Sequence, residues 1–337
     1  MRKLLSLLVF SVFCITARAQ DPNFSQFFAS PLTLNPALTG KFNGDVRVAG
    51  NYRNQWPTIN NAFTTYTVSA DFGILKNNIS EVDQFGVGVL GFSDQSGNGV
   101  LQYNYLGLST AYHKGLDEDG YNQLGAGFQA TYVSKRLDIS ALKFPDMLRS
   151  DGFTGVTQED FAATKLSVSY LDVNAGLLYT GTSNGLNNYY AGVSMYHINR
   201  PKESFKDGIY LLPTRLTVQA GGMVPVNGGS DAIHISANYS RQAKATNTVF
   251  GGAYMMNLNP EQPVPTNLYL GSWFRVGDAL IPYVGLEFGD FHVGLSYDVN
   301  VSSLKPASNM RGGAEISLIY IKQPRDPNQK KLNCPKF

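Results

Sequence analysis

The sequence is short of cysteine, of charge and of long apolar runs. Only Cys14 and Cys334 occur among 337 residues, and Cys14 lies in the apolar start of the chain. If that start is removed, one cysteine remains, which excludes an intrachain disulfide and a tetrahedral cysteine metal site. Charged residues make up 15% of the chain, against about 25% in soluble domains. Beyond residue 16 no apolar run is long enough for a membrane-spanning helix.

Residues 1–19 have the pattern of a secretory signal peptide. A charged start is followed by an apolar core over residues 4–16, and residues 17–19 read Ala-Arg-Ala. We therefore predict a signal peptide over 1–19, cleaved near Ala19/Gln20. Its removal takes three of the 27 basic residues and leaves 24 against 25 acidic ones. A near-neutral mature chain argues against nucleic acid as a partner, because such binding needs a basic surface.

What the sequence has instead is strict alternation of apolar and polar residues. Over 124–132, Leu, Ala, Phe, Ala and Tyr alternate with Gly, Gly, Gln and Thr, and the stretches 171–180 and 291–300 repeat the pattern. Side chains at period two give a strand one apolar and one polar face. At about ten residues, each stretch crosses a bilayer when tilted. The pattern predicts an all-β fold, a transmembrane antiparallel β-barrel.

About fourteen candidate strands follow residue 44. An even number places both ends of a bacterial barrel in the periplasm, with long loops outside. The links 135–166 and 199–213 follow odd strands and are long, whereas the Gly277-Asp278 turn and the link 257–266 break this trend. A soluble β-sandwich also alternates, but its strands are usually about five or six residues long. The predicted strands are 45–53, 63–72, 84–93, 100–113, 122–134, 167–180, 188–198, 214–224, 232–241, 246–258, 267–277, 279–288, 290–300 and 311–321.

The segment 20–44 interrupts this pattern with three prolines and several large apolar side chains. Leaving such side chains in water costs about 1.5–3 kcal/mol each. We predict that the segment forms a plug or lies against the periplasmic rim; an ordered lead-in strand is the alternative. The predicted organisation is therefore a signal peptide (1–19), an N-terminal plug or rim segment (20–44), an outer-membrane barrel (45–321) and a short polar periplasmic tail (322–337).

The polar faces of the predicted strands carry many titratable side chains. Charges in a narrow lumen must be hydrated or paired, and their mixed sign favours a filled interior over a water-filled pore. The predicted lumen network comprises Asp71, Asp172, Arg215, His234, Arg275, Glu287, His292, Asp298 and Glu315.

An enzyme is a weaker alternative. His234 and His292 are expected near Ser236 and Asp298, so a Ser-His-Asp hydrolase is conceivable. The groups stand on different strands, however, without a nucleophile elbow or an oxyanion signature. Paired histidines or carboxylates at metal-ligand spacing are missing as well. We expect no catalytic site, no metal and no cofactor.

Motifs along the whole mature chain resemble the type IX secretion system membrane proteins called PorP/SprF. The last motif departs slightly, because the family more often has Arg where Lys336 stands. The motifs are QDPNFSQF at 20–27, LNPA at 34–37, NYRNQWP at 51–57, YVS at 132–134, NAG at 174–176, HINRP at 197–201, LPTR at 212–215 and CPKF at 334–337.

This resemblance implies an outer-membrane barrel of a Bacteroidetes bacterium, similar in architecture to fourteen-stranded fatty-acid channels. Such proteins act with the type IX translocon, which exports surface adhesins and, in gliding species, motility adhesins. The implied partners are periplasmic lipoproteins of the translocon and secreted adhesin cargo with a C-terminal signal domain, within outer-membrane lipid. An interaction protein is therefore the favoured function, and a transporter of small or hydrophobic solutes is the alternative.

Several aromatic and polar residues outside the strands are candidate contacts for these partners. Trp56 has two interpretations, an anchor at the membrane interface or a binding hot spot. The segment 20–44 likewise has two interpretations, a plug inside the barrel or a docking strip for a partner. The candidate contacts are Phe24, Phe27, Phe28, Asn35, Pro36, Trp56 and Cys334.

Overall fold

A computed structural model describes residues 21–322 of the chain except 60–61, 75–79, 162–163, 165, 206–207, 263 and 265. The predicted signal peptide, the tail beyond residue 322 and Cys334 lie outside the described residues. Among the helices that are described, none is both long enough and apolar enough to cross a membrane.

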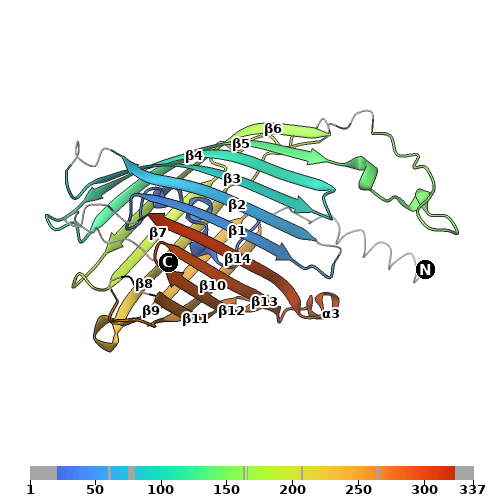
Figure 1. The fold of residues 1–337 in the computed structure, drawn as a ribbon. Coiled ribbons are helices and arrows are strands. Elements are labelled where there is room, and N and C mark those ends of the chain that lie inside the picture. Colours follow the sequence, from blue (N-terminus) through green and yellow to red (C-terminus); the bar gives the residue numbers. More distant parts are fainter. Residues whose placement is uncertain are drawn as a thin grey trace.

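The described chain forms one closed antiparallel barrel of fourteen strands, which confirms the predicted fold (Figure 1). Each strand pairs with its neighbours in sequence, and the first strand pairs with the last from Val46↔Lys322 to Gln55↔Gly313. The strands are β1 (Val46–Gln55), β2 (Phe63–Ile74), β3 (Gln84–Ser96), β4 (Leu101–Gly115), β5 (Gln123–Leu137), β6 (Ser167–Gly181), β7 (Asn188–Tyr196), β8 (Arg215–Val226), β9 (Asp231–Gln242), β10 (Ala245–Asn257), β11 (Thr266–Arg275), β12 (Ala279–Phe288), β13 (Phe291–Asn300) and β14 (Arg311–Lys322).

Many strand ends differ from the predicted ones by one to three residues, and two of these differences have a clear cause. Lys322, which we assigned to the tail, is the last residue of β14, because it pairs with Val46 and its carbonyl accepts a hydrogen bond from the Asp45 amide. In the other direction, β7 ends at Tyr196 rather than at residue 198. The chain leaves the strand there because His197 adopts a left-handed conformation, with φ of 59°.

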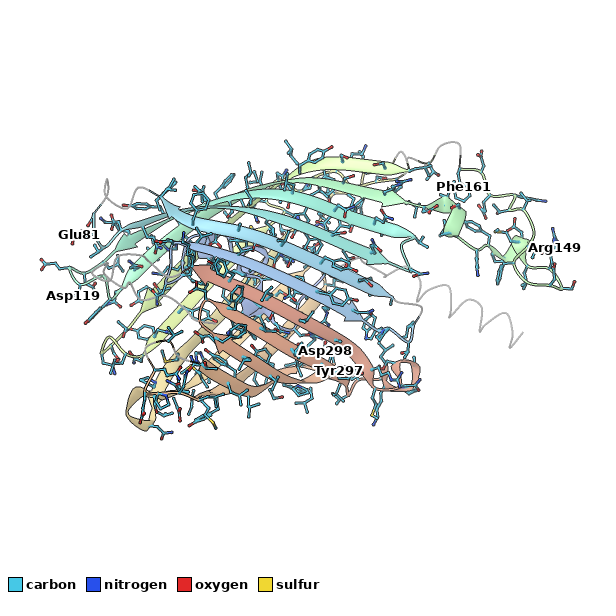
Figure 2. All side chains as sticks on the ribbon, in the orientation of Figure 1. Glu81, Asp119, Arg149, Phe161, Tyr297 and Asp298 are labelled. Carbon is cyan, nitrogen blue, oxygen red and sulfur yellow. The ribbon has the colours of Figure 1, made fainter. Side chains whose placement is uncertain are left out.

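The distribution of side chains is inverted relative to a soluble protein. Leu106, Leu108 and Leu171 are 63%, 64% and 66% exposed on the outer face, whereas the lumen face is lined by buried polar groups. Neighbours on β13 illustrate the alternation, since Tyr297 is 39% exposed and Asp298 is 2% exposed (Figure 2). An apolar outer wall closed by strand pairing is the arrangement that hydrocarbon requires.

The two ends of the barrel differ. One end carries the long connections, which include the 3-10 helices η4 (Ile139–Ala141) and η5 (Pro145–Met147) and the helix α3 (Lys305–Ser308). The other end carries mostly short turns, among them the 3-10 helix η6 (Asn227–Gly229). We call these the long-loop end and the short-turn end. β1 starts and β14 ends at the short-turn end.

The N-terminal segment Asp21–Gly44 fills the lumen, and we call it the plug. It contains the 3-10 helix η2 (Phe27–Ala29), the short helix α2 (Pro31–Leu34) and the 3-10 helix η3 (Pro36–Leu38). Figure 1 shows these elements in blue inside the barrel wall. Leu32 and Ala37 are completely buried, and Lys41 is 1% exposed. The plug that the prolines and aromatics predicted therefore occupies the barrel interior rather than the rim.

Small residues in the wall let the plug approach closely. A Cβ added at Gly127 on β5 would overlap the backbone of Pro36 and Ala37. At Gly176 on β6 it would overlap the side-chain oxygen of Asn35. These glycines thus leave room for the plug backbone, as glycine in a strand often does where another backbone comes near.

We expect Gly127→Ala to loosen the plug while the barrel still forms, because overpacking costs about 1–3 kcal/mol. The measurement is cleavage by trypsin after Lys41, which is shielded in the closed protein. Gly50→Ala on β1 is the matched control, because the atoms nearest to its added Cβ are 3.8 Å away or more. Equal protection of Lys41 in both variants would contradict this packing argument.

Candidate functional site: the closed lumen

The plug and the wall are joined by three clusters of buried charges, two toward the long-loop end and one at the short-turn end. Toward the long-loop end, Arg53 on β1 pairs with Asp298 at 2.7 Å and with Glu315 at 3.0 Å. Arg275 on β11 pairs with Asp298 at 2.6 Å. Strands β1, β11, β13 and β14 thus contribute two cations and two anions to one cluster, so the charges are compensated inside the wall.

The plug completes this cluster through Ser25 and Gln26. Their backbone N–H groups donate to the two carboxylate oxygens of Glu315 at 2.8 and 2.9 Å. The Ser25 hydroxyl donates to Asp298 at 2.6 Å, and the Gln26 amide donates to Ser296 at 3.1 Å. The carboxylate of Glu315 thereby fixes the plug backbone as well as the arginine.

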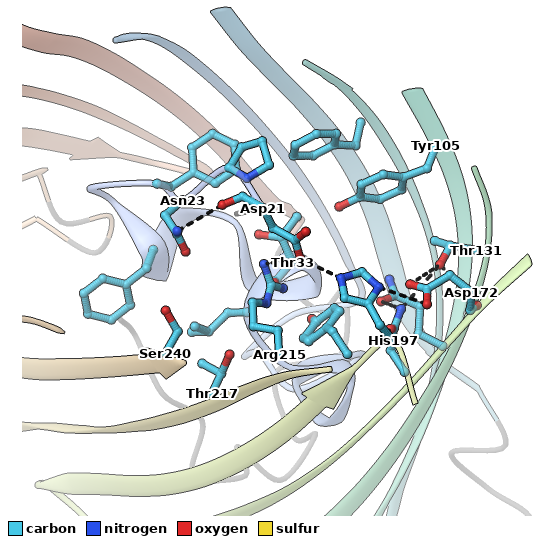
Figure 3. Close-up of a pocket in the computed structure, with 18 of the residues that line it drawn as sticks. Asp21, Asn23, Thr33, Tyr105, Thr131, Asp172, His197, Arg215, Thr217 and Ser240 are labelled. Carbon is cyan, nitrogen blue, oxygen red and sulfur yellow. Dashed lines mark hydrogen bonds and ion pairs between the residues drawn. The ribbon is translucent and has the colours of Figure 1, made fainter. Parts of the chain in front are cut away.

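A second charged cluster holds the start of the plug (Figure 3). His197 lies between two carboxylates, with Nε2 2.7 Å from Asp21 and Nδ1 3.0 Å from Asp172. Arg215 at the start of β8 lies 3.1 Å from Asp21 and stacks over the ring of Tyr196, 4.2 Å from its centroid. This cluster joins the plug to β6, β8 and the residue after β7.

The two groups of this cluster outside the strands have shifted pKa values. Burial alone would lower the pKa of His197, but Asp21 and Asp172 outweigh it and raise that pKa to about 9. Burial alone would raise the pKa of Asp21, but His197 and Arg215 outweigh it and hold that pKa well below its usual range. At neutral pH the His197 imidazole is therefore protonated and lies between the carboxyl groups of Asp21 and Asp172.

A third cluster lies at the short-turn end, where the plug leads into β1. Arg47 donates to the two oxygens of Asp71 at 2.9 and 2.7 Å and to the Leu38 carbonyl at 3.0 Å. The same carboxylate accepts from the Gly40 N–H at 2.7 Å. The bidentate pair therefore fixes the end of the plug, just as Glu315 fixes its beginning.

Asn35 holds the middle of the plug. Its side-chain amide donates to the Leu177 carbonyl at 3.0 Å and to the Val193 carbonyl at 3.3 Å, and its oxygen accepts from the Ala37 N–H at 2.8 Å. One side chain thus caps η3 and binds the backbone of β6 and β7. A capping asparagine with these wall contacts explains why the LNPA motif at 34–37 has this composition.

Aromatic side chains fill the remaining space. The ring of Phe28 lies 4.9 Å from Trp273 and 5.6 Å from Tyr283, and Phe24 lies 6.4 Å from Phe92, between centroids. Between the plug and the wall, beside Asp21, a cavity of about 50 Å³ remains. That volume holds a few water molecules rather than an organic solute.

The structure places most of the predicted partner contacts inside the barrel. Phe24, Phe27, Asn35 and Pro36 are buried inside the lumen and Phe28 is half-buried there, so in this closed conformation none is presented to an outside partner. Trp56 lies apart from them, with its ring 5.7 Å from Phe63.

The predicted lumen residues do face inward, but they do not form one network. Asp298, Glu315 and Arg275 share the first cluster, Asp172 and Arg215 belong to the second, and Asp71 belongs to the third. Elsewhere on the wall, the Tyr269 hydroxyl donates to Glu287, the Tyr283 hydroxyl lies 2.8 Å from His292, and His234 packs 5.6 Å from the Tyr269 ring.

Sequence reasoning missed Asp21, Arg47, Arg53 and His197. The two arginines share one face of β1 with Ala49 and Asn51, so the same alternation that located the strands already placed them inside. Asp21 and His197 gave no periodic signal, because both lie outside the strands.

The proposed Ser-His-Asp alternative does not fit the contacts. Asp298 is engaged by Arg53, Arg275 and Ser25, and the Ser236 hydroxyl accepts from the Trp273 indole at 2.9 Å. Among the described residues, no group of three or more His, Cys, Asp or Glu side chains is arranged to hold a metal ion.

Comparison with known proteins decides the family. The model of the type IX secretion system membrane protein PorP/SprF matches residues 16–320. The chain belongs to this family. No curated protein matches the chain. A PorP/SprF barrel with an apolar outer wall lies in the outer membrane. In bacterial outer-membrane barrels the short turns face the periplasm and the long loops face outward.

Solved outer-membrane barrels are similar to this PorP/SprF chain in architecture. The Pseudomonas putida toluene transporter TodX is 9% identical with a TM-score of 0.49, covering 86% of this chain and 92% of that one. The Ralstonia pickettii toluene transporter TbuX is 12% identical with a TM-score of 0.46, covering 86% and 91%. Acinetobacter baumannii Omp33 is 8% identical with a TM-score of 0.40, covering 83% and 98%. At this distance the similarity carries no information about ligands.

We expect the folded protein to lose stability as the pH rises through about 9. His197 is protonated in the folded state up to that pH but only to about 6.5 when unfolded, so its contribution is complete below pH 6.5 and is lost above 9. The shift corresponds to about 3 kcal/mol at most. The measurement is thermal unfolding in detergent between pH 6 and 10.

His197→Gln is the control for this pH dependence, because glutamine retains hydrogen bonding without the charge. The variant should unfold at a lower temperature at pH 7 and lose most of the fall in stability between pH 6.5 and 9. A fall of equal size in the variant would assign the pH dependence to other groups.

Proposed function

We propose that this PorP/SprF protein is a non-enzymatic component of type IX secretion that acts through binding surfaces. Its partners would be periplasmic lipoproteins of the translocon and/or the C-terminal signal domain of a surface adhesin, which in gliding species serves motility. The supporting observation is the closed lumen. A plug held at both ends and in the middle by buried hydrogen bonds occupies the lumen through which a solute would have to pass.

The closed lumen shifts the expected partner contacts to the two rims. On the outer side, the connection between β5 and β6 projects away from the barrel (Figures 1 and 2). It presents Leu148, Phe153 and Val156 at 55%, 45% and 85% exposure. Apolar side chains beyond the membrane are typical of protein-binding surfaces, and this loop suits an exported adhesin.

On the periplasmic side, the chain leaves the barrel after Lys322. The polar tail that follows, including Cys334, continues to be our candidate for binding translocon lipoproteins. Because the tail follows β14, which closes the barrel by pairing with β1, it would be held close to the membrane. Lipoproteins of the outer membrane are held there as well.

A transporter of small or hydrophobic solutes is the second hypothesis, and conductance separates the two. We expect the purified protein in planar bilayers to show no steady large conductance, because the plug backbone is fixed to Glu315 and Asp71. Deleting residues 21–38 should open a steady pore, which controls for correct insertion. A large steady conductance of the complete protein would favour transport.

We expect deletion of residues 323–337 to leave the barrel folded and to reduce recovery of translocon lipoproteins in pull-downs to background. The truncation keeps Lys322, because this residue pairs with Val46 at the barrel seam. A tail of the same length made of glycine and serine controls for chain length, and Cys334→Ser tests the cysteine separately. Unchanged recovery after deletion would count against the tail.

A further inference from the structure

The barrel wall has a local gap beside β6. β6 spans Ser167–Gly181, whereas its pairing with β7 covers only Ala175–Gly181. On its other side β6 pairs with β5 as far as Ser167. On the β7 side, the last backbone bond is donated by the Ile198 N–H to the Val173 carbonyl at 3.0 Å. Among the described residues, the part of β6 beyond Val173 therefore has no strand paired on that side, which makes it a strand edge in an otherwise closed barrel.

Asn199 ends the pairing at this edge. Its side-chain oxygen accepts from the Val173 N–H at 3.1 Å, and its amide donates to the Leu171 carbonyl at 2.7 Å. The asparagine thus takes the place of one peptide unit of a neighbouring strand. The chain then turns away through Arg200, which has a φ of 45°.

The connection between β7 and β8 does not continue along β6. It forms a short hairpin with a bridge between Lys202 and Leu211. Glu203 on this hairpin pairs with Lys135 at 2.6 Å and accepts from the Tyr170 hydroxyl at 2.8 Å. Both partners are lumen-side groups of β5 and β6, and Leu212 is buried. The described residues of the hairpin therefore fold over the lumen mouth and do not cover the edge.

The hydrogen-bonding direction along the edge follows from the bonds at Val173. The N–H and C=O of one residue in an antiparallel strand point to the same side, and the side alternates from residue to residue. Since Val173 and Leu171 bond toward the β7 side, Ser169 and Ser167 point that way too. Among the described residues, neither backbone has a partner on that side, and both serines are exposed.

We propose that this edge, Ser167–Leu171, binds an extended segment of an exported polypeptide by strand addition on the outer face of the membrane. The inference rests on the proposed export function for the identity of the segment. A polypeptide backbone alone repeats donors and acceptors at the spacing that the edge offers. The edge also lacks the lysine, proline or bulge with which proteins usually block such pairing.

The position of the edge suits an aqueous partner. Leu171, 66% exposed, belongs to the apolar outer wall, and Ser169 and Ser167 continue the same face beyond it. A second copy of this chain fits less well. Two barrels inserted in the same direction hold their β6 strands parallel, and parallel pairs have slanted hydrogen bonds that are slightly less stable per residue. A free polypeptide segment can instead bind in the antiparallel direction.

The test uses the complete protein in lipid nanodiscs and a fluorescent ten-residue peptide of alternating Thr and Val. We expect Ser169→Pro to weaken binding at least about tenfold, because proline removes the outward N–H and its ring blocks the edge. Ser169→Ala keeps the backbone and should bind as the original chain does. The Ser169 N–H takes no part in the pairing with β5, so both variants should remain folded, which heat-modified gel migration checks.

A peptide with N-methyl groups on alternate residues completes the test. It should fail to bind the original chain, because strand addition needs its N–H groups. Equal binding of the methylated peptide, or of the plain peptide to Ser169→Pro and Ser169→Ala, overturns the inference, as does binding that depends on dimerisation.

Secretion in cells separates this inference from the proposed function. If both hold, Ser169→Pro lowers adhesin export and Ser169→Ala does not, while both variants still recover translocon lipoproteins. Normal export by a folded Ser169→Pro variant that still recovers the lipoproteins contradicts strand addition at the edge and leaves the proposed export function intact. Normal export in cells lacking the whole protein sinks the export function itself.

Discussion

Hydrocarbon around the wall is the constraint on which this molecule depends. Because the outer face is apolar, the polar half of every strand must face inward, and the lumen collects buried charges that must be hydrated or paired. Arginines, carboxylates and the plug backbone therefore satisfy one another. The closed lumen is in this sense a consequence of the membrane and not an addition to the barrel.

The buried ion pairs fix the position of the plug, but they contribute little net stability to the folded protein. Replacing such pairs by apolar side chains often costs little, whereas removing one partner is strongly destabilising. Glu315 and Asp71 each bind an arginine of β1 and plug backbone N–H groups at the same time. Wall and plug thus share their acceptors, so neither can be rearranged without leaving a buried charge unpaired.

Period-two alternation located all fourteen strands and the polar face of the wall, because both depend only on neighbours in sequence. The partners of that polar face depend on strands far apart in the chain. Arg53 meets Asp298 and Glu315 only after β1 and β14 close the barrel. The same limit explains the misassigned aromatics. Phe24 and Phe27 gave the signal of a segment that needs burial, but the sequence does not say whether a partner or the lumen buries it.

The position of the plug also constrains how the barrel assembles. Asp21 lies toward the outer mouth, and the chain descends through the lumen to Gly44 before it becomes β1. β1 is at the same time the strand that meets β14 at the seam. If the seam closed first, the segment would have to be threaded end-on through a mouth. If β1 pairs with β14 around a plug that is already in place, no threading is needed. Closure of the barrel and blockage of its lumen then occur in a single step.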